Sequence, residues 1–300
     1  MADIRSHISV CVCTFKRAEL LRRLLTKLRS QITEGEFTFS VVVADNDAEQ
    51  SASPLVQEFS RASDLKISYC VEPRQNIALV RNKALQTADG DMIAFIDDDE
   101  VPDAKWLLNL FNTCRAYQAD GVLGPVKPYF DHDPPAWVVK GGFFERPDYP
   151  TGYELRWNEC RTGNVLFNRR ILALVDVPFR PEFGTAGEDM DFFRRMIENG
   201  CRFVWCSAAA AFELVPESRC KRSFLLKRAL LRGSNFPKHP SKRLVNFLKS
   251  VVAVPAYTLA LPILALIGQH LFVKYLVKIC DHASRLLAFA GWAVVKERET

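Results

Sequence analysis

A run of three carboxylates at residues 97–99 directly follows an apolar stretch at residues 92–96. The apolar stretch predicts a buried strand, so the carboxylates lie where that strand ends. Ionised carboxylates placed side by side repel one another, and burial adds a desolvation cost. A divalent cation bound by oxygen ligands would compensate for this charge. The alternative is a solvated acidic turn in which Asp99 or Asp103 caps a helix that starts near Pro102.

The elements that must position these carboxylates alternate along the first half of the chain. The expected strands cover residues 8–13, 40–44, 66–71 and 92–96, and the expected helices cover residues 18–31, 54–62, 77–87 and 104–117. Strands that are continuously apolar, with helices between them, predict an α/β doubly wound sheet that is mostly parallel and flanked by helices. Ligands bind such sheets beyond the carboxyl ends of the strands. Asp45 and residues 97–99 both lie at such ends.

The middle of the chain is less regular. Residues 125–150 are rich in Pro, Gly and aromatic side chains, and they predict a long ordered loop over the sheet edge. This loop is either a substrate lid or a small satellite core. Gly163 and Asn164 then precede a short apolar strand at residues 165–167, and Glu188 and Asp189 open a helix with one apolar side. One explanation of these two carboxylates is that they are acidic residues that stabilise the N-terminus of the helix.

The C-terminal part changes in character. Residues 221–249 contain nine Lys or Arg and no Asp or Glu, and residues 250–273 contain no Lys, Arg, Asp or Glu. An apolar stretch of about twenty residues can cross a bilayer, and membrane helices tolerate kinks such as those expected at Pro255 and Pro262. The basic block predicts a cytoplasmic side, whereas Lys296 and Arg298 favour a re-entrant or interfacial hairpin. The alternative is a buried helical pair in a soluble domain.

Length and composition narrow the protein class. The 300 residues, 48% of them hydrophobic, are enough for one large domain with an appendage. We expect a catalytic domain at residues 1–216, a basic helical linker at 217–249 and an apolar, helical, membrane-associated segment at 250–300. The nine cysteines are odd in number and include no CxxC pair, which argues against a disulfide framework or a zinc site. No signal-peptide core precedes the first strand, so a cytosolic setting is expected.

Taken in order, these segments resemble the family 2 glycosyltransferases of GT-A fold. The resemblance rests on residues 12–17 after the first strand, Asp45, a helix opened by residues 76–82, a DxD-like run at 97–99 and an ED-like pair at 188–189, and it covers about residues 7–215. It implies a Rossmann-like sheet and a nucleotide-diphosphate sugar as donor. In such a reaction a divalent cation, Mg²⁺ or Mn²⁺, stabilises the charge that develops on the leaving diphosphate.

The resemblance also implies roles on the donor side. Asp99 is the expected metal ligand, Asp97 is expected to face the ribose or the nucleotide, and Asp98 is the ambiguous middle residue of the nucleotide-sugar site. Thr14 is expected to line the base site. Asp45 is expected to accept a hydrogen bond from the imide N–H of uracil, which favours a UDP-sugar, and its alternative role is that of a turn residue.

Two further donor-side residues leave alternatives open. Arg81 resembles the basic residue that lies near the nucleotide in this family, and it is otherwise an ordinary residue of a helix surface. Glu100 departs from the pattern, because many relatives carry a smaller residue there, and it is interpreted as a helix N-terminal charge.

On the acceptor side, Asp189 is the expected catalytic base. In an inverting transfer, one carboxylate removes the proton of the acceptor hydroxyl as its oxygen attacks the anomeric carbon. Glu188 is expected to assist orientation or to contact the acceptor. Gly163 and Asn164 resemble the turn that lies near the acceptor in this family, where glycine allows close approach.

The absence of a QxxRW motif and of multiple apolar segments argues against a processive synthase. The resemblance then implies transfer of one hexose to a lipid-linked oligosaccharide in bacterial exopolysaccharide or cell-surface glycan biosynthesis, at the cytoplasmic face of the inner membrane. The basic block would face anionic lipid or the pyrophosphate of a polyprenyl-linked acceptor. The rival interpretation is a non-catalytic membrane- or nucleic-acid-binding protein with a degenerate nucleotide-sugar site. No recognised nucleic-acid motif accompanies the basic block, so no nucleic-acid partner is expected.

Overall fold

The structure is a computed structural model that describes residues 5–184, 187–234 and 243–292. The chain divides into two compact units. One consists of Met1–Pro128 and Arg146–Leu214, and because it contains the residues predicted for catalysis it is called the catalytic unit below. The other consists of Tyr129–Glu145 and Val215–Thr300, and is called the helical unit. The division expected at residues 1–216, 217–249 and 250–300 stays a prediction.

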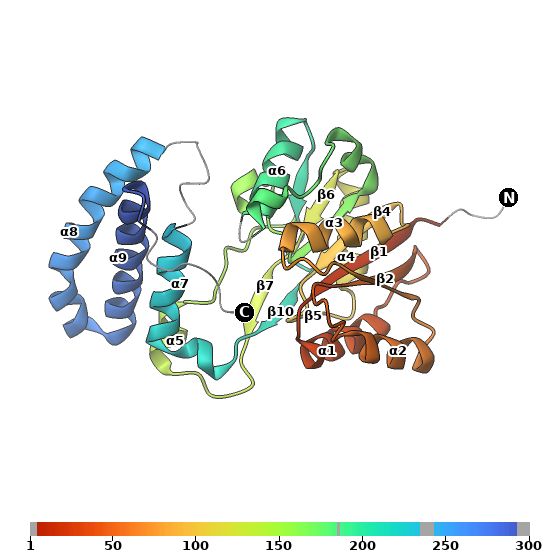
Figure 1. Ribbon diagram of the computed structural model, residues 1–300, viewed down its shortest axis with the longest axis horizontal. Helices are drawn as coiled ribbons and strands as arrows, with labels where there is room; N and C mark the ends of the chain where they lie inside the picture. The colour runs from red at the N-terminus through yellow and green to blue at the C-terminus, as the bar shows by residue number, and fades with distance from the viewer. Residues whose placement is uncertain (1–4, 185–186, 235–242, 293–300) are drawn as a thin grey trace. The chain divides into compact units, whose positions relative to one another are not determined.

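A seven-stranded sheet forms the centre of the catalytic unit (Figure 1). Its strand order is β3 (Ile67–Val71), β2 (Thr38–Asp45), β1 (His7–Thr14), β4 (Met92–Ile96), β8 (Asn164–Asn168), β6 (Gly121–Leu123) and β9 (Phe203–Trp205). In the described part of this sheet, β8 alone runs antiparallel to its neighbours, β4 and β6. The prediction of a mostly parallel α/β sheet is therefore confirmed.

Helices cover both faces of this sheet (Figure 1). They are α1 (Ala18–Arg29), α2 (Ser53–Ala62), α3 (Ile77–Thr87), α4 (Trp106–Ala116) and α6 (Glu188–Glu198). In β1, Val10 and Val12 join the core under α1, α2 and α4, whereas Cys11 joins the core under α3 and α6. Because successive strand residues point to opposite faces, burial of both faces explains why the strands read as continuous apolar runs.

The polypeptide after β4 does not enter a helix. It turns through residues 97–99 into β5 (Glu100–Pro102), which pairs in a second sheet of order β5, β10 (Ala211–Leu214) and β7 (Val126–Tyr129). Helix α4 begins only at Trp106, and its N-cap Lys105 makes no side-chain capping bond. The interpretation of Asp99 or Asp103 as a helix cap is therefore wrong, as is that of Glu100 as a helix N-terminal charge.

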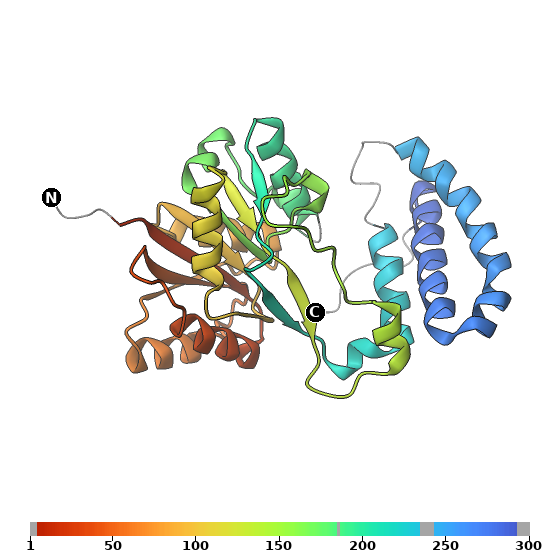
Figure 2. The same cartoon turned by 180° about the vertical axis from the view of Figure 1, so that it is seen from behind.

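Four helices dominate the helical unit: α5 (Ala136–Gly141), α7 (Arg222–Ser234), α8 (Arg243–Ile267) and α9 (Gln269–Phe289). Figures 1 and 2 show α9 between α7 and α8, and α9 packs against both of them as well as against α5. Phe130, Trp137 and Phe144 pack around Val138, Val215 and Cys220. The middle segment thus contains α5 and contributes a satellite core, as one of its two interpretations predicted.

Four short 3₁₀ helices complete the described elements: η1 (Trp157–Glu159), η2 (Arg169–Leu174), η3 (Pro181–Phe183) and η4 (Glu217–Cys220). All nine cysteines are free, which agrees with the absence of a disulfide framework. One helix in the described ranges, Leu244–Ile267, is long and apolar enough to cross a membrane by length and composition alone. It continues through both Pro255 and Pro262.

Candidate active site

The register of the parallel strands brings the first predicted residues together. Thr14 ends β1 and lies opposite Asp45 at the end of β2, and β4 pairs with the other side of β1. The side chains after β4 therefore share an edge of the sheet with Thr14. The Thr14 hydroxyl donates a 2.8 Å hydrogen bond to Asp98 Oδ2, and Arg17 Nη1 donates one of 3.1 Å to Asp98 Oδ1. Asp98 is thus buried and held by β1 and the residue before α1.

The two carboxylates on either side of Asp98 are more accessible. The side chain of Asp97 is 45% exposed and that of Asp99 is 13% exposed, and Arg17 lies 3.6 Å from Asp99 Oδ2. Desolvation raises the pKa of Asp97 to about 7; Asp99 and Asp98 add to the rise, and Arg81 opposes it. The raised pKa of Asp97 means that the described chain does not fully compensate its ionised form, which a cationic ligand would favour.

These carboxylates fit a cation that arrives with a phosphorylated ligand. Among the described residues, no group of three or more His, Cys, Asp or Glu side chains could hold a metal ion by itself. Mg²⁺, however, is commonly bound by one or two carboxylates together with substrate phosphates and water. Asp97 and Asp99 supply hard oxygen atoms of this kind on one short turn.

Both carboxylate oxygens of Asp45 accept hydrogen bonds from other groups of the protein. The residue is fully buried, Oδ1 accepts a bond from Asp47 N (3.0 Å), and Oδ2 accepts bonds from Ala52 N (2.9 Å) and the Tyr69 hydroxyl (2.8 Å). Burial, together with this hydrogen bond to Asp45, raises the pKa of Tyr69. The alternative role of Asp45 as a turn residue is therefore observed. The sequence reasoning missed Tyr69, which lies on β3, the strand that pairs with β2.

A buried ion pair links the two predicted carboxylate motifs. Arg81 on α3 is 7% exposed, and its Nη1 donates a short hydrogen bond to Glu188 Oε1. Its Nη2 lies 3.8 Å from Asp97 Oδ1. Arg81 is therefore not an ordinary residue of a helix surface. It connects the turn after β4 with the first residue of α6, and the two residues of the ion pair are 107 positions apart in the sequence.

Glu188 and Asp189 are neighbours with different surroundings. Glu188 is buried and bound to Arg81, and desolvation raises its pKa although Arg81 opposes the rise. Asp189 is partly exposed, and its Oδ1 accepts a 2.7 Å hydrogen bond from Met190 N. No residue of the described ranges forms an ion pair with Asp189. Of the two, Asp189 is thus the carboxylate that a substrate can reach.

Helix α6, which carries both carboxylates, is fixed by a second set of charges. Asp191 is 1% exposed, and it accepts a 2.9 Å hydrogen bond from Arg195 Nε one turn later. Arg194 and Arg180 lie 3.3 and 3.7 Å from the other oxygen of Asp191. The sequence reasoning missed Asp191, for which the EDMD run was the available signal.

Gly163 and Asn164 lie at the start of β8 beside the carboxylates. A Cβ atom on Gly163 would be 2.7 Å from Glu100 Oε1 and 3.0 Å from Asp97 Oδ2, so a larger residue fits only if these side chains shift. The Asn164 amide is fully engaged. Its oxygen accepts a 2.8 Å bond from Trp106 Nε1, and its nitrogen donates to the carbonyl oxygens of residues 209 and 125. The side-chain amide of Asn164 would therefore have to give up one of these hydrogen bonds to contact an acceptor.

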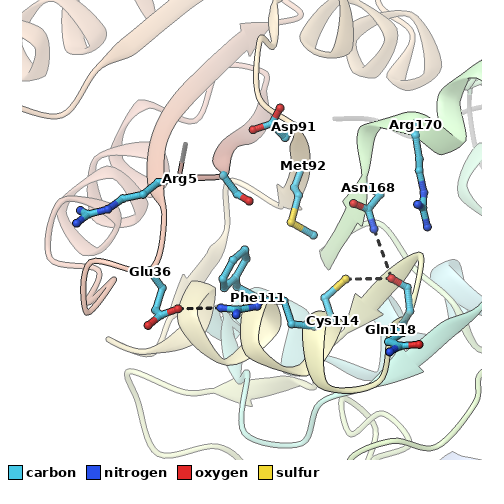
Figure 3. A pocket seen from close by; sticks show the side chains of 12 residues that line it. Arg5, Glu36, Asp91, Met92, Phe111, Cys114, Gln118, Asn168 and Arg170 are labelled. Carbon is cyan, nitrogen blue, oxygen red and sulfur yellow. Dashed lines mark hydrogen bonds and ion pairs between the residues drawn. The ribbon is translucent and has the colours of Figure 1, made fainter. Parts of the chain in front are cut away.

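A cavity of about 580 Å³ lies elsewhere in the catalytic unit (Figure 3). It is lined by Met92, the first residue of β4, and by Asn168, the last residue of antiparallel β8. These residues mark the amino end of β4, whereas the carboxylates follow its carboxyl end. None of the residues predicted for the active site lines this cavity.

Comparisons with known proteins identify the family of this chain. Residues 9–173 match the model of glycosyl transferase family 2. The chain is 36% identical over 232 residues to the succinoglycan biosynthesis protein ExoM of Rhizobium meliloti (strain 1021), covering 76% of this chain and 73% of that protein. It is 25% identical over 244 residues to the chondroitin synthase of Pasteurella multocida (strain Pm70), covering 71% of this chain and 25% of that protein.

Solved structures show the same fold at lower identity. The crystal structure of S. aureus TarS 1-349 in complex with UDP has a TM-score of 0.55 and 18% sequence identity, covering 95% of this chain and 90% of that one. The complex of the same protein with UDP-GlcNAc also has a TM-score of 0.55, at 17% identity. With the family model matched over more than half of its length, this chain belongs to glycosyl transferase family 2 and is a glycosyltransferase of GT-A fold.

Proposed function

We propose that the chain is an inverting glycosyltransferase that moves one hexose from a UDP-sugar to a lipid-linked oligosaccharide. The observation that carries the proposal is the division between the two carboxylates that open α6. Glu188 is neutralised by Arg81, whereas Asp189 is partly exposed and has no ion pair in the described chain. An unpaired, accessible carboxylate at a sheet edge lined with further carboxylates is suited to act as a general base.

The donor is proposed to bind at the turn after β4. Asp99 would hold Mg²⁺ or Mn²⁺ against the diphosphate while Asp97 faces the nucleotide, and the bound cation would stabilise the leaving group's charge. Thr14, Asp45 and Asp98 are proposed to shape the nucleotide side of the site, since their side chains order the ends of β1, β2 and β4. The UDP and UDP-GlcNAc complexes of TarS support a uridine nucleotide.

Transfer then needs one proton acceptor and no covalent enzyme intermediate. The acceptor oxygen forms a bond to the anomeric carbon while the bond from that carbon to the diphosphate oxygen breaks. Asp189 takes the hydroxyl proton as attack proceeds, and the nucleoside diphosphate leaves with the electron pair. Arg81 keeps Glu188 in a buried ion pair, so Glu188 orients the start of α6 rather than competing for the proton.

The acceptor and the cellular setting are proposed from the relatives and the C-terminal helices. ExoM is named as a succinoglycan biosynthesis protein, which supports a role in bacterial exopolysaccharide or other cell-surface glycan biosynthesis. A lipid-linked acceptor would be met at the cytoplasmic face of the inner membrane. The basic block and the long apolar helix α8 support an association with that membrane. Gly163 brings the backbone before β8 close to Asp97, and an acceptor sugar is proposed to lie near this turn.

The test of this proposal is the variant Asp189→Asn, which keeps the shape of the side chain and removes its basicity. We expect the transfer rate to fall by about 10²- to 10⁴-fold, because that is the usual contribution of a general base. Binding of UDP, measured by calorimetry with Mn²⁺ present, should change by less than about twofold, because the base lies outside the proposed donor contacts.

The matched control is Glu198→Gln, an exposed carboxylate at the end of the same helix, which should transfer at the normal rate. A screen of nucleotide sugars for Mn²⁺-dependent hydrolysis or transfer in membrane extracts identifies the donor used in both assays. Normal transfer by Asp189→Asn would show that another group accepts the proton.

A further inference from the structure

We infer that helix α8 lies along the surface of an anionic bilayer, with one face among the lipids, and does not cross the membrane. This inference rests on the proposed function and specifies how the chain contacts the membrane proposed there. The face concerned, called the outer face of α8 below, carries large apolar side chains that are 55–89% exposed. Its residues are Leu244, Leu248, Val252, Leu259, Ile263 and Leu266.

The outer face repeats at intervals of three, four or seven residues, so it forms one continuous stripe along the helix. The opposite side of α8 packs against α9. The rings of Phe247 and Phe289 lie 4.5 Å apart, and those of Tyr257 and Tyr275 lie 5.1 Å apart. A helix that is apolar on all sides requires apolar surroundings on both sides, and in the described chain α9 supplies only one of them.

Polar contacts show which part of α9 lies beside the middle of α8. Ser250 Oγ lies 2.9 Å from His282 Nδ1, and Lys278 Nζ lies 5.6 Å from the centre of the Tyr257 ring. Asp281, between these two α9 residues in the sequence, is therefore at the same level. If α8 crossed a bilayer as packed, this polar part of α9 would enter the hydrocarbon core.

The charged network of α9 also extends to α7. Asp281 accepts a 3.0 Å hydrogen bond from Arg232 of α7 and one of 2.5 Å from Arg285. Because α7 packs on α9, a spanning α8 would carry this network into the membrane interior as well, where ionised side chains are unfavourable. A helix that lies flat buries its outer face and leaves α9 and α7 on the protein side of the interface.

Charge identifies lipid as the occupant of the outer face. Residues 215–300 contain 15 Lys or Arg and four Asp or Glu, so this part of the chain is strongly positive. Anionic headgroups attract such a surface. A second copy of this chain would bring the same positive charge to the contact, which opposes dimerisation through α8. The 25 residues of α8 extend about 37 Å, which gives a long apolar stripe for the headgroup and acyl boundary.

The experiment measures the depth of three positions along the outer face with the full chain and no substrate. Leu244→Trp, Val252→Trp and Leu266→Trp are each bound to phosphatidylcholine–phosphatidylglycerol vesicles whose lipids carry bromine either near the headgroup or deep in the acyl chain. The quenching of the wild-type protein, which has five tryptophans, is subtracted. A flat helix predicts the same preference for the shallow quencher at all three positions. Stronger quenching of Val252→Trp by the deep quencher, with shallow quenching at both ends, would show that α8 spans and would overturn the inference.

A binding assay tests the choice of lipid as occupant. The double variant Val252→Asp/Leu259→Asp should partition onto these vesicles at least about tenfold more weakly than the wild type, because it places charge on the buried face. Leu174→Asp, which alters a residue 46% exposed in the catalytic unit, is the matched control and should bind normally. Binding to phosphatidylcholine alone should also be at least about tenfold weaker.

Failure of the wild type to bind vesicles, or a dimer in sedimentation that the double variant abolishes, would overturn the assignment of lipid. Because neither assay contains donor or acceptor, these outcomes are independent of whether Asp189 is the base.

Discussion

The two units handle apolar and charged side chains in opposite ways. In the catalytic unit, leucines such as Leu21 and Leu24 are 0% exposed, and charged residues such as Arg81 and Glu188 are buried in pairs. In the helical unit, Leu259 is 80% exposed on a helix of which little is covered. The first arrangement holds the carboxylates in place at the edge of the sheet. The second leaves an apolar surface that is available to lipid.

The charge balance follows the same division. Residues 215–300 hold 15 of the 40 Lys and Arg but only four of the 35 Asp and Glu. Residues 1–214 therefore hold 25 basic and 31 acidic side chains. An acidic region suits a cation-assisted reaction of phosphorylated sugars, and a basic region suits an anionic surface. The comparison implies that substitutions in one unit should leave the readout of the other unit unchanged.

The largest expected effect is that of Arg81→Gln. Removal of one partner of a buried ion pair leaves an uncompensated carboxylate, so the free energy of unfolding of the catalytic unit should fall by about 3–5 kcal/mol. Urea denaturation measures this, and transfer should fall in parallel. Vesicle binding of the variant should equal that of the wild type under conditions in which the catalytic unit of both is folded. A loss below about 1 kcal/mol would mean that Glu188 finds another partner or becomes neutral at little cost.

Leu24→Ala should have the next largest effect. The residue is fully buried between α1 and the sheet, and such a truncation destabilises by about 2–5 kcal/mol through lost burial and a cavity. Thermal unfolding followed by circular dichroism checks this value. If Leu24→Ala were as stable as the wild type, the core of the catalytic unit would be less tightly packed than its burial indicates.

Gly163→Ala should cost about 1–3 kcal/mol, because its Cβ would lie 2.7 Å from Glu100 Oε1. The double variant Gly163→Ala/Glu100→Asp shortens the neighbouring side chain and should be destabilised by less than the sum of the two single changes. Urea denaturation of all three variants forms the cycle. Strict additivity would contradict the close packing of these two residues.

The smallest stability change is expected for Leu259→Ala, on the outer face of α8. Because this side chain is already exposed in the chain itself, the free energy of unfolding in solution should change by less than about 0.5 kcal/mol. Vesicle binding should weaken, because the leucine side chain is buried only when lipid is bound, and alanine buries less apolar area there. A large loss of stability without lipid would instead mean that the outer face packs against another part of the protein.

Much of the catalytic unit was predictable because its elements are local patterns. Helix α3 (Ile77–Thr87) and strand β4 (Met92–Ile96) have the bounds that their periodicity predicts. Asn76 caps α3 by accepting bonds from the N–H groups of residues 78 and 79, a signal that a sequence carries openly. The antiparallel insertion of β8 was not predictable, because no local pattern specifies which strands become neighbours.

Site residues divide in the same way. The types and order of residues 97–99, 188 and 189 indicated a carboxylate site and a family, and the family match bears out the family. The contacts of the site residues could not be predicted from the sequence. Glu100 looked like a helix end because its strand partner, Glu213, is far away in the sequence. Asp45 looked open to a nucleotide, yet the turn that follows it and Tyr69 use both its oxygens.

By itself, the sequence determined the alternation of strands and helices, the positions of the carboxylates at strand ends and the apolar character of α8, since each depends on composition and spacing within a segment. Only the tertiary structure decided that Glu188 is buried in an ion pair while Asp189 is partly exposed, because the buried arginine that binds Glu188 comes from α3. It also decided which side of α8 faces the protein, because α9 packs against one side and leaves the other exposed. Pairing and burial are relations between distant segments, and no single segment encodes them.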